Sequence, residues 1–251
     1  MCYDVQSKLE TLLKRAIRFH DDEGIRRLKI ELAPYLTNHY HVSGFTHPSL
    51  LIYSDKNSFT PVPSVWGLVP HWVKDQKQKL QLWNNTINAR GETLFEKPSF
   101  REAALKNRCI LYLDGFYEHH YHKTRPFPFF IYKKDKTPLA VAGLWSEWLD
   151  KESGEIVNSF TIVTTKANDI MRKIHNNPKL AEARMPLILN EKDEEKWLES
   201  TTDENFIKSL IRPYTETELA CHSVQKLRGK NAVGNIPEAS EEFIYEELEA
   251  F

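Results

Sequence analysis

The chain has 251 residues, of which 41% are hydrophobic and 27% are charged, and its formal net charge is −1. This length is enough to bury a sizeable hydrophobic core. No apolar run approaches the roughly 20 residues of a membrane-spanning helix, which excludes a helical membrane protein, and with no secretory signal we expect a cytoplasmic location. The three cysteines have no zinc-binding spacing, so we expect no disulfide framework, no metal and no cofactor.

The predicted elements begin with two helices and continue as a β-rich region. Apolar residues at helical spacing predict a helix over 5–19, and Asp21-Asp22 would cap a second short helix that ends before Pro34. Later helices are expected over 167–174 and over most of 191–224. Between these helices lie short β-rich segments at 50–53, 62–70, 108–121, 128–134, 138–149 and 158–167.

Few helical stretches separate these β-rich segments, which indicates an antiparallel sheet. The predicted fold class is α+β, a single domain with a strongly curved antiparallel β-barrel-like core and peripheral helices. The charge is uneven along the chain: the last fourteen residues, EASEEFIYEELEAF, contain six Glu and no Lys or Arg. The net charge does not by itself indicate a nucleic-acid-binding protein, but it is compatible with a local basic groove.

Cys2 directly follows the first methionine and is the first candidate for chemistry. Chance is the simplest interpretation of a Cys at this place. If the methionine is removed, however, Cys2 carries both an α-amine, with an ordinary pKa of about 7.7–8.0, and a thiol, with an ordinary pKa of about 8.5. Both groups are then partly in their reactive forms near neutral pH.

Three later motifs carry further candidate side chains. The motif WGLVPHW is followed by NAR, whose Asn88 is by itself more often a turn residue than a catalytic one. The motif DGFYE ends an apolar run with Glu118, which is solvated at a strand end unless it faces a cleft. In a cleft, desolvation would raise its pKa and suit it to acid–base catalysis. The motif MRKIH ends with His175, and a lone histidine at a helix end is usually structural.

Taken in order, the motifs are more specific than any one of them. They are Cys at position 2, W-G-L-V-P-x-W, N-A-R, R-C-x-x-x-x-D-G-F-Y-E, A-G-L-W, T-x-x-T-x-x-A-N and I-H…R-M-P. This series resembles the SOS-response-associated peptidase (SRAP) family, also called abasic-site processing proteins. The resemblance extends from Cys2 to V-G-N at 233–235. We therefore predict a SRAP-like domain over 1–237 and an acidic tail, outside the resemblance, over 238–251.

The resemblance implies a protein that protects damaged DNA by forming a covalent crosslink to abasic sites in single-stranded DNA. The α-amine of Cys2, exposed by methionine removal, would attack the open-chain aldehyde of the sugar to give a Schiff base. The thiol of the same residue would then close a five-membered thiazolidine ring, an intramolecular step with a high effective molarity. The implied active residues are Cys2, Asn88, Glu118 and His175.

The implied roles follow from side-chain chemistry. His175 would help to open the sugar ring, Glu118 would shuttle protons and Asn88 would hold the amine. The resemblance also implies DNA contacts through Arg90 and Arg184. Aromatic wedges would splay the strand, and core packing is the competing interpretation for these rings; the two candidates are Trp66 and Phe116.

The chain departs from the family at several positions. Tyr3 and Asp4 stand where the family has Gly and Arg, and the Asp4 carboxylate is expected to repel a phosphate backbone. His119 replaces the usual Trp after D-G-F-Y-E. The eight residues NNPKLAEA separate His175 from Arg184, where the family is often much tighter.

Two other functions stay open at this point. One is an N-terminal-nucleophile cysteine peptidase or amidase, with Cys2 as nucleophile and His175 or the α-amine as base; self-removal of Met1 would be its mildest form. The other is a non-catalytic module that binds single-stranded nucleic acid. Neither of these, nor the crosslinking function, involves a membrane.

Overall fold

Five strands close into a barrel at the centre of the computed structural model, which describes residues 2–18, 20–30, 32 and 37–248. The strand β9 pairs with both β6 and β10, and β10 connects through β4 and β3 back to β6. Two three-residue strands, β5 and β11, extend the sheet from β10. The bounds are β3 Ser49–Ser54, β4 Asn57–Trp66, β5 Asn88–Arg90, β6 Arg108–Leu113, β9 Leu139–Leu149, β10 Ile156–Lys166 and β11 Arg184–Pro186.

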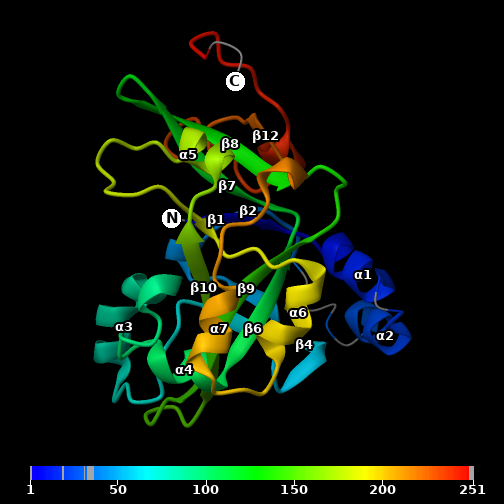
Figure 1. Ribbon diagram of the computed structural model, residues 1–251, viewed down its shortest axis with the longest axis vertical. Coiled ribbons are helices and arrows are strands. Elements are labelled where there is room, and N and C mark those ends of the chain that lie inside the picture. The colour runs from blue at the N-terminus through cyan, green and yellow to red at the C-terminus, as the bar shows by residue number, and fades with distance from the viewer. Residues whose placement is uncertain (1, 19, 31, 33–36, 249–251) are drawn as a thin grey trace.

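A second, five-stranded antiparallel sheet stands against the barrel (Figure 1). Its strand order is β12 (Leu219–Ser223), β8 (Arg125–Lys133), β7 (Gly115–His122), β1 (Asp4–Ser7) and β2 (His39–Ser43). The chain passes from β6 of the barrel directly into β7 of this sheet at Asp114. The Asp114 carboxylate fixes the crossing, because it accepts a hydrogen bond from the backbone N–H of Lys8 at 2.9 Å.

Alternating strand residues divide the apolar side chains between two main clusters. Leu50 and Ile52 belong to a cluster that includes Trp66 and continues into the second sheet, whereas Leu51 and Tyr53 belong to a cluster under the helices. The helices are α1 Leu9–Arg18, α2 Asp22–Ile30, α3 Gln76–Trp83, α4 Arg101–Lys106, α5 Asp169–Ile174, α6 Glu191–Leu198 and α7 Glu204–Leu210. In the described part of the chain, none of them is long and apolar enough to cross a membrane.

The structure confirms the α+β class, the curved barrel-like core and the peripheral helices, with local corrections. The pairings of β10 with β4 and β5 are parallel. Residues 5–7, the start of a predicted helix, belong to β1, because pairing with β2 and β7 outweighs the helical spacing of Val5 and Leu9. The predicted strand over 108–121 is two strands in different sheets, and Leu219, predicted to be helical, lies in β12.

Some predictions fall on residues that the structure does not describe. The predicted end of the second helix before Pro34, Met1 and the last three residues of the acidic tail lie outside the described residues. The helices α3 and α4 and the short strands β2, β5 and β11 were not predicted.

Candidate active site

Cys2 lies in the cluster between the barrel and the second sheet, with only 1% of its surface exposed. The amide nitrogen Nδ2 of Asn88 donates a hydrogen bond of 2.8 Å to the backbone oxygen of Cys2. The other amide atom, Oδ1, is buried and makes no hydrogen bond to the described residues. Because the Cys2 oxygen can only accept, the amide orientation is fixed and its oxygen is left as an unpaired acceptor.

The sequence around the motif W-G-L-V-P positions Asn88. In β5, Asn88 pairs with Ile162 of β10, and the Trp66 ring nitrogen Nε1 donates 2.9 Å to the backbone oxygen of Ile87. Gly67 has a φ of 122°, which side-chain-bearing residues rarely adopt, and its N–H bonds to Phe160 as β4 ends. This motif therefore supports the strand that holds Asn88.

Glu118 and His175 face one another across the same region. Oε2 of Glu118 lies 3.6 Å from Nδ1 of His175, and the two side chains are 11% and 4% exposed. Oε1 of Glu118 accepts the backbone N–H of His119 at 2.9 Å. Nδ1 of His175 also lies 2.9 Å from the backbone oxygen and 3.2 Å from the backbone nitrogen of Arg184, so Arg184 holds the ring through this nitrogen.

Two contacts between the end of α5 and β7 fix this pair. The Asn176 side chain accepts the N–H of Tyr121 at 2.6 Å and donates to its backbone oxygen at 3.0 Å. His120 contacts the backbone oxygen of Lys173 at 2.9 Å. Sequence analysis did not identify Asn176. The only sequence signal is its position directly after I-H, where an Asn is expected at a helix end anyway.

Burial determines the electrostatics of the site. It raises the pKa of the Cys2 thiol far above its ordinary value, and the negative charge of Glu118 raises it further. Burial lowers the pKa of His175 below 6.5, although Glu118 opposes this shift. At neutral pH the site therefore contains a protonated thiol and a neutral imidazole.

The two predicted DNA-contacting arginines have different environments. Arg184 is 3% exposed, and its guanidinium contacts Glu92 at 2.7 Å and Glu182 at 3.2 Å. The side chain of Arg90 is 52% exposed and lies 3.5 Å from Glu182. Arg90 is therefore available to solvent, whereas Arg184 holds together β11, β10 and the segment NNPKLAEA that carries Glu182.

The structure places both predicted aromatic wedges in the core. Trp66 and Phe116 are each 0% exposed, and Trp66 stacks on Phe160 with ring centroids 6.1 Å apart. These positions correspond to the core-packing interpretation. The described residues include a more exposed aromatic pair near Cys2, because the rings of Tyr3 and Phe45 lie 4.7 Å apart and Phe45 is 46% exposed.

The expectation that Asp4 presents a repelling charge is wrong for this structure. Asp4 is 3% exposed, and its carboxylate contacts Arg228 at 2.6 Å and His41 at 3.0 Å. Burial alone would raise its pKa, but the hydrogen bonds and charge of these partners lower it. Because the guanidinium of Arg228 is half-exposed, this position presents a cation to solvent instead.

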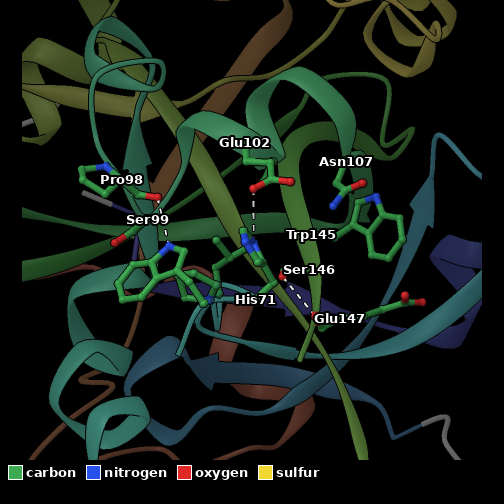
Figure 2. A pocket seen from close by; sticks show the side chains of 12 residues that line it. His71, Pro98, Ser99, Glu102, Asn107, Trp145, Ser146 and Glu147 are labelled. Atoms are coloured by element: carbon green, nitrogen blue, oxygen red, sulfur yellow. Dashed lines mark hydrogen bonds and ion pairs between the residues drawn. The ribbon is translucent and has the colours of Figure 1, made fainter. Parts of the chain in front are cut away.

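The motif W-G-L-V-P-x-W also ends at a small cavity of about 130 Å³, separate from the residues above (Figure 2). His71 and Trp72 contribute from the motif, and Glu102 from α4 lies 3.3 Å from His71. Figure 2 shows Trp145 and Glu147 of β9 on the other side. Neither Cys2 nor its partners line this cavity.

Comparisons with known proteins give the family of the chain. The family described as SOS response associated peptidase (SRAP) matches residues 6–231, a range that begins just after Cys2. The abasic site processing protein YoqW of Bacillus subtilis (strain 168) is 37% identical over 195 residues, which are 75% of this chain and 81% of that protein. The abasic site processing protein HMCES of Pongo abelii is 30% identical over 266 residues, covering 90% of this chain and 72% of that protein.

A solved structure gives the same result for the fold. The crystal structure of a protein from Bacteroides thetaiotaomicron has a TM-score of 0.82 and 31% sequence identity. The similarity covers 97% of this chain and 100% of that one.

Proposed function

The chain belongs to the SOS response associated peptidase (SRAP) family, and on that basis we propose that it captures abasic sites in single-stranded DNA covalently through Cys2. The names of its relatives support DNA with abasic sites as the substrate. Within the fold, the observation that carries the proposal is the Asn88 amide, which binds the Cys2 backbone and keeps a buried oxygen to which none of the described residues donates a hydrogen bond.

The unpaired oxygen of Asn88 suits an amine on Cys2. A buried acceptor without a partner is costly, and an N–H donor on the Cys2 nitrogen would satisfy it. In the peptide bond to Met1 this nitrogen has one N–H and no nucleophilic lone pair, and removal of Met1 would make it an α-amine with additional N–H donors and a nucleophilic lone pair. The Asn88 side chain would then bind both the backbone carbonyl and the α-amine of Cys2.

The first chemical step would be attack by the amine. At neutral pH the thiol is protonated, because burial and Glu118 raise its pKa, so the amine is the stronger nucleophile. The amine nitrogen would bond to the aldehyde carbon of the open sugar, and the aldehyde oxygen would leave as water, giving a Schiff base. Neutral His175, whose imidazole can accept a proton, suits the proton transfer that opens the sugar ring.

The second step would close the ring. The sulfur would add to the carbon of the Schiff base, and the thiol proton would end on the nitrogen, so that the product contains a thiazolidine and one water has been released overall. The charge of Glu118 reaches both the thiol and His175, which suits this carboxylate to carry that proton. Arg90, exposed at the end of β5, is a candidate contact for the strand.

Denaturing gel electrophoresis tests the proposal. The protein is incubated with a single-stranded oligonucleotide whose one uracil has been converted into an abasic site, and with the matching duplex. We expect a band that resists denaturation with the single strand, none with Cys2→Ser and none with protein that mass spectrometry shows to retain Met1. A heat-stable band from either of these forms would refute the mechanism.

The competing functions give different results in the same experiment. Cleavage of a fluorescent peptide library with no crosslinked band would indicate a peptidase. Tight binding to intact strands with no covalent product would indicate a non-catalytic binding module.

A further inference from the structure

A basic cavity of about 390 Å³ lies between the β7–β8 hairpin and the segment that follows β12. Three of its lining residues are cations: Arg125, Lys226 and Arg228. The remaining lining residues are apolar, aromatic or histidine, and none carries a carboxylate. A concave surface lined by charges of one sign concentrates its field and attracts an anion.

Two residues connect this cavity with the candidate active site. Arg228 contacts Asp4 at 2.6 Å and the Ser43 hydroxyl at 3.4 Å, and Asp4 is two residues from Cys2. His119 lines the cavity and directly follows Glu118, so these two side chains lie on opposite faces of β7. Arg228, through Asp4, therefore brings a cation of the cavity within a short path of Cys2.

The acidic tail already pairs a carboxylate with one of the cations that line this cavity. Glu247 contacts Arg125 at 2.8 Å. The tail is held beside β12 (Figure 1), because the N–H of Phe243 bonds to Ser223 at 2.8 Å and the Tyr245 ring lies 4.9 Å from that of Phe127. The tail residues around Glu247 are thus anchored by aromatic contacts.

Glu247 is charged at neutral pH. A backbone hydrogen bond lowers its pKa, and Arg125 and Lys226 lower it further. The contact with Arg125 joins side chains that are 44% and 60% exposed, and ion pairs with this exposure are weak. A stronger anion can therefore displace this carboxylate.

We propose that the basic cavity binds a phosphate of the DNA strand held at Cys2, and that Glu247 pairs with Arg125, one of the cations of the cavity, in the free protein. The proposal rests on the proposed function for the identity of the strand. A phosphodiester is the anion that fits, because an arginine guanidinium binds phosphate and carboxylate oxygens in the same geometry. The acidic tail would then compete with the DNA phosphate for Arg125. This competition would lower the affinity of the protein for strands that bind weakly.

Fluorescence anisotropy with an intact single-stranded oligonucleotide tests the proposal, since no crosslink forms on such a strand. The variants are Lys226→Gln in the cavity and Glu247→Gln in the tail. The matched controls are Lys77→Gln on α3 for Lys226→Gln and Glu242→Gln in the tail for Glu247→Gln. Each control removes the same charge at a residue outside the contact between Glu247 and Arg125. Arg228 is left intact, because its removal would unpair the buried Asp4.

We expect Lys226→Gln to reduce the slope of log K against log salt by about 0.7, the value for one lost phosphate contact on a single strand. Glu247→Gln should tighten binding about two- to fivefold at low salt, as expected for loss of one weak exposed ion pair. This gain should shrink when Arg125→Gln is also present. Lys77→Gln should leave the slope unchanged, and Glu242→Gln should have a smaller effect than Glu247→Gln.

An unchanged salt slope in Lys226→Gln, together with unchanged affinity in Glu247→Gln, would overturn the proposal. Thermal melts establish that each exposed-residue variant is folded. The abasic oligonucleotide is tested in parallel on a denaturing gel. A crosslink with unchanged slopes would refute the cavity alone, whereas the expected slopes without any crosslink would support the cavity and refute the proposed function.

Discussion

Replacing Glu118 by Gln separates the proton-transfer role of this residue from its place in the fold. The Gln side chain keeps the shape, and its oxygen can still accept the N–H of His119, as Oε1 does now at 2.9 Å. What disappears is the negative charge and the ability to carry a proton between sulfur, nitrogen and the leaving water. We therefore expect Glu118→Gln to fold and to bind intact single strands at least as well as the wild type.

The rate of crosslinking should fall by at least tenfold. General acid–base catalysis is typically worth 10²–10⁴-fold, or about 3–5 kcal/mol of barrier. The lower bound applies if solvent replaces Glu118 in part, and its 8% exposure leaves little room for this. Single-turnover reactions with an abasic single strand from pH 5.5 to 8.5 measure the rate.

The reactivity of the thiol should change in the opposite direction. Glu118 is the second cause, after burial, that raises the pKa of Cys2. Its loss should lower that pKa, although burial keeps it above the ordinary value, so alkylation of Cys2 at pH 8 should become faster while crosslinking becomes slower. Cys109 is 0% exposed and reports on unfolding, because it should stay unmodified in the same mass spectrum.

The control is Glu147→Gln, which removes an exposed carboxylate beside the cavity of Figure 2. Glu147→Gln should change neither the rate of crosslinking nor the rate of Cys2 alkylation. If Glu118→Gln crosslinks at the wild-type rate at every pH, Glu118 is a structural carboxylate at a strand end. Modification of Cys109 in the variant would instead show that faster alkylation reflects unfolding, and would refute the interpretation of the thiol.

The sequence predicted several long strands well, because long segments rich in apolar and β-branched residues have few alternatives to a buried strand. The strands β8 of the second sheet and β9 and β10 of the barrel are such segments, and each lies within a few residues of its predicted place. Three-residue strands such as β5 and β11 contain no periodicity, since only pairing with β10 makes them strands. Residues 4–7 show the same limit, because helical spacing in the sequence competed with a pairing that depends on residues 39–43 and 115–117.

The candidate site also has one part that the sequence predicts and one part that it does not. Cys2, Asn88, Glu118 and His175 stand in sequence motifs, and the structure brings them into two contacting pairs. The partner of Asp4 could not be predicted, because 224 residues separate it from Arg228 and an isolated Arg carries no signal. The charge of a residue in the sequence therefore does not give the charge that the folded surface presents.

The remaining predictions concern binding, stability and the strand-contacting arginine. Cys2→Ser should abolish the denaturant-resistant crosslink and change the affinity of noncovalent binding by no more than a few-fold. A much larger loss of noncovalent affinity would show that the thiol contributes to binding instead. Noncovalent binding to single strands should have a salt slope of magnitude about 2–4, at about 0.7 for each phosphate contact, and a slope near zero would contradict a phosphate-tracking surface. Burial lowers the pKa of His175, so the unfolded chain takes up this proton first as the pH falls. Its contribution to stability is then full above about pH 6.5 and declines below it, and His175→Gln should lose less melting temperature between pH 7.5 and 5.5 than the wild type. Glu182 contacts Arg90 at 3.5 Å and Lys166 at 3.6 Å, and both cations are more than half exposed. Because such pairs are weak, Glu182→Gln should release the two cations to a phosphate, tighten single-strand binding about two- to fivefold at low salt and steepen the salt slope. Fluorescence anisotropy with Glu182→Gln alone and with Glu182→Gln combined with Arg90→Gln tests this explanation. The gain in single-strand affinity should disappear when Arg90 is also replaced. A gain that persists would mean that Glu182 repels the strand directly and does not act by pairing with Arg90.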